Sequence, residues 1–119
     1  MSKQGVIAMR LADKPFELIK SGVKTVEVRL YDEKRRALKV GDNIIFSRSA
    51  DPNDKIRATV KALYKFDTFS DLYSSELFEK CGCGGMTAEQ AVEYIYGYYT
   101  KENERRYGVL GIEIEAVNG

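Results

Sequence analysis

The sequence of 119 residues contains no histidine. This absence excludes chemistry that needs an imidazole base or an imidazole metal ligand. Ser-His-Asp and Cys-His catalysis, HExxH proteolysis and the H-x-E zinc deaminases are therefore ruled out. A histidine-dependent ribonuclease is ruled out for the same reason. Any catalysis by this chain must use lysine, tyrosine, carboxylate, hydroxyl or thiol groups.

Cysteine and long apolar runs are also scarce. The two cysteines, Cys81 and Cys83, are too few for a disulfide-stapled secreted protein. Without histidine, they cannot complete a four-ligand zinc site. No apolar run approaches the ~20 residues of a membrane span, and the first residues resemble a strand rather than a signal peptide. We therefore expect a cytoplasmic protein with no metal, no cofactor and no membrane partner.

Charge is balanced in total, at +1, but it is unevenly distributed. Between Lys20 and Arg48, eight basic and four acidic residues give a net charge of +4. Between Phe66 and Glu104, eight acidic and two basic residues give −6. The N-terminal half is therefore the better candidate for binding an anionic partner.

Apolar residues that alternate with polar ones indicate β-strands. Strands are expected at residues 6–11, 25–31, 43–48, 56–66 and 110–116. The length suits one domain that spans residues 1–119. This pattern predicts an α+β fold with a mainly antiparallel, curled sheet of five or six strands and two or three peripheral helices.

Two helices are indicated by their end signals. The first is expected from about Lys14 to Ser21, with Asp13 as the N-cap and Gly22 after its last turn. The second is expected over residues 88–99, after a capping-box sequence that starts at Thr87. Residues 69–80 have room for a further helical turn or two.

The segment Gly22-Val-Lys24-Thr-Val-Glu27-Val-Arg29 brings three ionisable groups together. The glycine ends the first helix and the strand starts at once, so Lys24 lies in the turn before the strand. Glu27 and Arg29 are two residues apart, so they project from the same face of the strand. One interpretation is a solvated polar strand face. The other is a site in which Glu27 orients the two cations toward an anionic ligand.

Three blocks of the sequence resemble the ASCH domain family of the PUA-like superfamily. The family signature G-x-K-x-x-E-x-R is complete between Gly22 and Arg29. Residues 38–46 and 99–112 resemble the family's second and closing blocks, and the three blocks stand in the family's order. The resemblance implies a PUA-like β-barrel with a basic cleft around the signature. The implied ligand is RNA, a nucleotide or a modified nucleoside.

The same resemblance carries an enzymatic alternative. A few small members hydrolyse N4-acylated cytidine with the signature lysine, a threonine and a glutamate, and another branch is described as metal-independent ribonucleases. Here Lys24 matches, but Glu27 replaces the threonine, and residues 81–85 contain no carboxylate where the glutamate would stand. Lys24 and Glu27 are the catalytic candidates if the chain is an enzyme. Because this set of catalytic residues is incomplete, the sequence favours ligand binding over hydrolysis.

Arg106 and Tyr107 are further candidates, because they precede the last expected strand. In the simplest interpretation they are a surface arginine and a packed tyrosine. In a cleft, Arg106 would contact a phosphate and Tyr107 would stack on a base. The basic run at residues 34–36 is interpreted as a solvated loop that could also contact phosphate. The predicted ligand-binding residues are Lys24, Glu27, Arg29, Arg106 and Tyr107.

Overall fold

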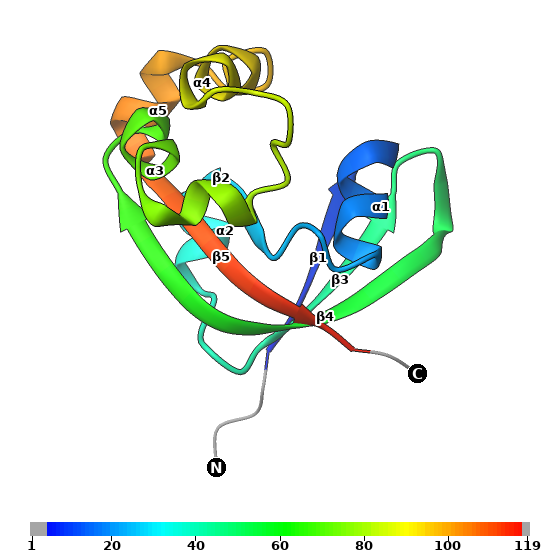
Figure 1. The fold of residues 1–119 in the computed structure, drawn as a ribbon. Coiled ribbons are helices and arrows are strands. Elements are labelled where there is room, and N and C mark those ends of the chain that lie inside the picture. Colours follow the sequence, from blue (N-terminus) through cyan, green and yellow to red (C-terminus); the bar gives the residue numbers. More distant parts are fainter. Residues whose placement is uncertain (1–4, 118–119) are drawn as a thin grey trace.

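A computed structural model describes residues 5–117 (Figure 1). Its centre is one five-stranded sheet in the order β1-β3-β4-β5-β2. The strands are β1 (Val6–Leu11), β2 (Val26–Leu30), β3 (Asn43–Arg48), β4 (Asp51–Phe66) and β5 (Val109–Ala116). β1 and β3 are parallel, and all other neighbours are antiparallel. The predicted mainly antiparallel sheet is therefore confirmed.

The sheet curls into a half-barrel, and Figure 1 shows the long β4 bending along its base. β4 pairs with both β3 and β5, and its register against β5 shifts between Val60 and Ala62. An irregularity of this kind bends a strand and increases its twist. β1 and β2 are the two edges of the sheet. The Arg29 side chain links these edges, because its Nη2 donates a hydrogen bond to the Arg10 carbonyl on β1 at 2.9 Å.

Apolar side chains form two clusters on opposite faces of the sheet. One cluster packs Phe16 and Ile19 of the first helix against residues such as Phe46 and Ile112. The other packs Val26 and Val28 against the later helices, through residues such as Phe69 and Leu72. Because β2 alternates between these faces, Glu27 and Arg29 face the first cluster while their valine neighbours face the second.

The helices are more numerous than the two or three expected. They are α1 (Asp13–Lys20), α2 (Glu33–Arg36), α3 (Phe69–Tyr73), the 3-10 helix η1 (Glu76–Lys80), α4 (Ala88–Ile95) and α5 (Lys101–Tyr107). α1 begins one residue early, with Ala12 as its N-cap, so the assignment of Asp13 as the cap is wrong. Asp13 Oδ1 instead lies 3.3 Å from Arg48 Nη1. Gly22 follows this helix with φ +82°, the left-handed conformation that the sequence predicts.

The predicted capping box is confirmed at Thr87 and Gln90, but α4 ends at Ile95 instead of near residue 99. The chain turns after the helix, and this turn brings the rings of Tyr96 and Tyr99 to 5.9 and 5.5 Å from that of Phe69. Packing of these aromatic rings therefore outweighs the local preference for a longer helix. Within residues 5–117, no helix has the length and apolar character needed to cross a membrane.

Candidate functional site

Lys24, Glu27 and Arg29 form one ion-pair cluster, which we call the charged triad. Glu27 Oε1 lies 2.8 Å from Lys24 Nζ, and Glu27 Oε2 lies 2.7 Å from Arg29 Nε. The exposed fractions of the side chains are 5% for Glu27, 12% for Lys24 and 14% for Arg29. These values show that the three charges are not a solvated strand face.

Backbone hydrogen bonds fix the position of each member of the triad. In β2, Glu27 pairs with Ile112 and Arg29 pairs with Leu110, which sets both side chains over an apolar surface. The Lys24 amide donates to the Leu18 carbonyl of α1 at 3.0 Å. The next amide, of residue 25, donates to the carbonyl of residue 80 at 2.9 Å. The turn that carries Lys24 is therefore held between α1 and the end of η1.

Burial and neighbouring charges shift the pKa values of Glu27 and Arg29 in opposite directions. Burial alone would raise the pKa of Glu27, but the neighbouring Lys24 and Arg29 outweigh it and lower that pKa below 4.5. Burial alone would lower the pKa of Arg29, but the Glu27 carboxylate, with help from Tyr99, raises it. Glu27 and Arg29 therefore both carry charge at neutral pH. Together with the Lys24 ammonium, the triad presents two formal positive charges and one negative charge.

The loop between η1 and α4 packs against Lys24. A Cβ atom on Gly82 would lie 3.0 Å from Lys24 Cβ, and Gly82 itself adopts φ +73°. The flanking Cys81 and Cys83 are free thiols. Burial raises the pKa of Cys81 to about 12 and also raises the pKa of Cys83. A raised thiol pKa leaves little thiolate at neutral pH, so this loop shapes the surroundings of Lys24 and supplies no activated nucleophile.

Gly82→Ala is expected to lower the free energy of unfolding by about 1–3 kcal/mol, because alanine is strained at positive φ. The new methyl group would also push against the stem of Lys24. Gly84→Ala is the matched control, because nothing lies within 4 Å of a Cβ atom at Gly84. Urea unfolding of both variants measures the difference. Equal stability of the two variants would mean that the loop does not constrain Lys24.

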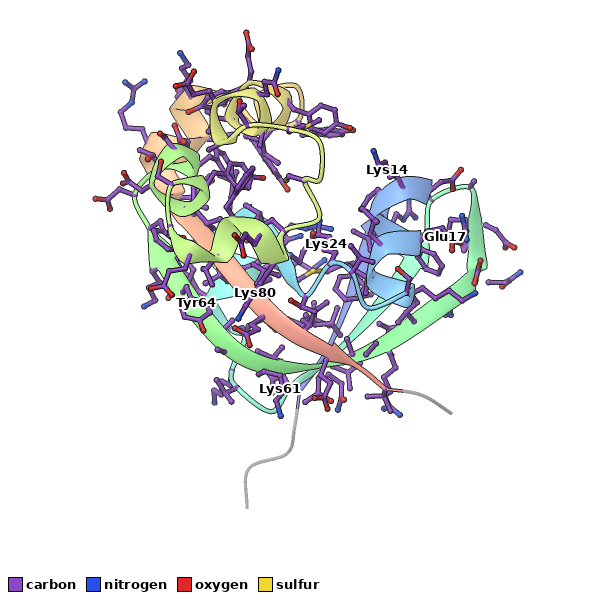
Figure 2. The ribbon with its side chains drawn as sticks, in the orientation of Figure 1. Lys14, Glu17, Lys24, Lys61, Tyr64 and Lys80 are labelled. Atoms are coloured by element: carbon purple, nitrogen blue, oxygen red, sulfur yellow. The ribbon has the colours of Figure 1, made fainter. Side chains whose placement is uncertain are left out.

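Lys24 also lines a groove of about 470 Å³, which we call the Lys24 groove. Its polar side chains are Lys20, Ser21, Lys24, Thr25, Lys61, Glu113 and Glu115. Figure 2 shows Lys24, Lys61 and Lys80, which come from three separate segments, around strand β5. A cavity of this volume is in the range of small-molecule sites.

One of the two carboxylates in this groove, that of Glu113, already contacts other side chains. Lys80 Nζ lies 3.9 Å from Glu113 Oε1, and the Tyr64 hydroxyl donates a hydrogen bond to the same oxygen at 3.0 Å. Attraction to this carboxylate, led by the hydrogen bond, raises the pKa of Tyr64. Lysines in the groove therefore outnumber the carboxylates that remain to neutralise them. The groove is suited to an anionic or strongly polar ligand.

Comparison with known proteins identifies the family of this chain. The family model described as the ASCH domain matches residues 9–118. The chain belongs to the ASCH domain family. A comparison with curated proteins found no match.

Solved structures similar to this ASCH domain share its architecture. The crystal structure of the hypothetical protein PH0355 is 38% identical, with a TM-score of 0.85, and the match covers 94% of this chain and 99% of that one. The solution structure of PF0455 from Pyrococcus furiosus is 32% identical, with a TM-score of 0.73, and the match covers 98% of this chain and 100% of that one. An ASCH protein from Zymomonas mobilis is 18% identical, with a TM-score of 0.61, and the match covers 91% of this chain and 65% of that one. The curled sheet of this ASCH domain is consistent with the expected PUA-like fold.

Arg106 and Tyr107 lie apart from Lys24 of the charged triad. They end α5 just before Val109, which pairs with Leu30 at the end of β2, whereas Lys24 precedes the start of β2. A strand of this length spans roughly 15 Å, at about 3.3 Å per residue. The residues predicted for one site in the ASCH domain are therefore spread along β2. Lys24 precedes its start, whereas Arg106 and Tyr107 lie near the end that carries Arg29.

Two tyrosines beside the triad were not predicted as part of the site. Burial raises the pKa of Tyr99, which lies near Arg29 and Glu27. Burial also raises the pKa of Tyr73, which lies near the thiols of Cys81 and Cys83. Both tyrosines therefore present neutral hydroxyls near the charges at neutral pH. Sequence patterns gave no signal for them, because packed and ligand-facing tyrosines share the same apolar spacing.

Proposed function

We propose that this ASCH domain binds RNA or a nucleotide in the Lys24 groove, with the Lys24 ammonium contacting a phosphate or a polar base edge. The observation that most supports this proposal is the burial of the charged triad. Replacing a buried ion-pair cluster by apolar residues of similar volume is often neutral or stabilising. The triad is therefore not explained by stability alone, and the positioning of a cation for a ligand is a sufficient explanation.

The triad prepares Lys24 for such a contact. An ammonium group has three N–H bonds. Among residues 5–117, Glu27 is the carboxylate within ion-pair distance of it. Further N–H donors can therefore meet a ligand in the groove that Lys24 lines. Because Glu27 and the turn before β2 already hold this side chain, binding costs less conformational entropy than ordering a mobile lysine.

The geometry favours binding without turnover. Both oxygens of Glu27 are engaged by cations, and its lowered pKa makes it a weak general base at neutral pH. The loop at residues 81–85 supplies no carboxylate to replace it. We therefore expect N4-acylated cytidine to be bound without hydrolysis and short RNA to be retained without cleavage.

Lys24→Met is expected to weaken binding of a single-stranded oligouridylate of about ten nucleotides by at least about tenfold, the scale of one lost charge-assisted hydrogen bond. Methionine keeps an unbranched stem next to Gly82 while removing the charge. Lys55→Met, at an exposed position on β4 outside the Lys24 groove, is the matched control. Fluorescence anisotropy measures the affinities, and thermal melting confirms that both variants are folded.

The salt dependence of the same titration tests the role of charge. Three lysine contacts to a single strand predict a slope of log affinity against log salt near about −2. Lys24→Met should make this slope shallower by about 0.7. Wild-type affinity and slope in this variant would contradict the proposed function.

A further inference from the structure

The far end of β2 carries a second groove, of about 480 Å³, which we call the tyrosine groove. Its lining residues are Tyr31, Lys65, Phe66, Asp67, Asp71, Tyr107, Gly108 and Val109. The Tyr31 amide donates to the Gly108 carbonyl at 2.9 Å, which fixes the segment after β2 beside the end of α5. The tyrosine groove thus joins two half-buried aromatic rings from distant parts of the sequence.

Three exposed cations lie over these rings. Lys65 Nζ is 4.8 Å and Arg36 Cζ is 5.0 Å from the centroid of the Tyr31 ring. Arg106 Cζ is 5.3 Å from the centroid of the Tyr107 ring. Aromatic rings interleaved with cations are the combination that single-stranded nucleic acids require, because the rings stack on bases and the cations meet the backbone.

We propose that the tyrosine groove is a second contact surface for single-stranded RNA, on which unpaired bases stack against Tyr31 and Tyr107. A stacked base is held more strongly than an exposed cation over the same ring. A base therefore displaces a cation from its ring, and the displaced cation of Lys65, Arg36 or Arg106 meets a backbone phosphate. The surface reads the presence of unstacked bases and not their sequence.

The carboxylates of the groove help to decide the class of ligand. Asp67 and Asp71 line it and partly offset the three cations. A ligand held by charge alone, such as an acidic peptide, gains little affinity from a surface whose positive charge is partly neutralised. A ligand that also stacks gains from the two rings whatever the net charge. The observations therefore favour single-stranded RNA over an acidic protein segment.

This inference goes beyond the Lys24 groove and does not depend on it. The two grooves lie at opposite ends of β2, roughly 15 Å apart at about 3.3 Å per residue. A mononucleotide can occupy only one of them, whereas an oligonucleotide can contact both. The length of the ligand therefore separates the two proposals.

The test compares a fluorescent oligouridylate of about ten nucleotides with uridine 5′-monophosphate. Tyr107→Leu should weaken oligouridylate binding at least about fivefold, because leucine fills space but cannot stack. Tyr107→Phe should retain wild-type affinity. The double variant Lys65→Ala/Arg106→Ala, at two exposed positions, should also weaken oligouridylate binding, while Lys55→Ala serves as its control. None of these variants should change the affinity for the mononucleotide.

Wild-type oligouridylate affinity in folded Tyr107→Leu and in the double variant would overturn the tyrosine groove while leaving the Lys24 groove intact. Displacement of the oligouridylate from this surface by an acidic peptide of equal charge would also overturn it. Conversely, loss of oligouridylate binding in these variants with no effect of Lys24→Met would support the tyrosine groove and reject the proposed function.

Discussion

Glu27→Ala is expected to lower the free energy of unfolding by about 3 kcal/mol, because it leaves two largely buried cations without a counter-ion. Lys24 and Arg29 both lose the carboxylate that lies within 2.8 Å of them. Chemical denaturation measures the change, and an unchanged m-value would show that only stability is affected. Glu115→Ala, at an exposed position on β5, is the control and should change stability by under about 0.5 kcal/mol.

The pH dependence of the same effect identifies charge as its cause. The folded pKa of Glu27 lies below its ordinary value of 4.5. Its stabilisation is therefore complete above that value and is lost as the pH falls through the lower folded pKa. The stability difference between wild type and Glu27→Gln should stay constant above about pH 5 and shrink below it. A difference that does not change with pH would mean that packing, and not charge, holds the cluster.

Glu104→Ala is expected to lower the free energy of unfolding by about 2–4 kcal/mol, although Glu104 lies in a charged stretch of α5. Its side chain is buried; Oε2 accepts a hydrogen bond from the Phe69 amide at 2.7 Å and Oε1 accepts one from the Tyr96 hydroxyl at 2.7 Å. Removal of the carboxylate leaves both donors without their partner. This carboxylate also contributes, after burial, to raising the pKa of Tyr96 to about 12.

The control for this change is Glu102→Ala, at an exposed position in the same helix. Glu104→Gln should retain more of the stability than alanine, because its amide oxygen still accepts one hydrogen bond. A cost for Glu104→Ala no greater than that of Glu102→Ala would show that water replaces the carboxylate.

Much of the sheet could be predicted because its strands bury alternate residues. The strands expected at residues 6–11 and 43–48 have those bounds in the structure. The two-residue spacing of Glu27 and Arg29 likewise predicted their common face, which the 2.7 Å contact confirms. In these cases a local period reports directly on which side of the strand is buried.

Other features depend on contacts that no local pattern encodes. α2 and α5 were missed because they are short and polar, and the capping side chains of Asp32 and Thr100 were their main signal. The packing of Gly82 against Lys24 joins residues far apart in sequence. The separation of Arg106 from Lys24 follows from the antiparallel register of β2 and β5, which the sequence does not reveal.

Lys24 is proposed to hold the ligand in the groove that it lines. Titration of the isotope-labelled 13.5 kDa protein with uridine 5′-monophosphate, followed by its amide NMR signals, locates the ligand on the molecule. We predict that the shifted amides cluster at residues 20–25 and 113–116 and that Lys24→Met abolishes these shifts. Shifts that persist undiminished in this variant, or that cluster elsewhere in wild type, would contradict the claim.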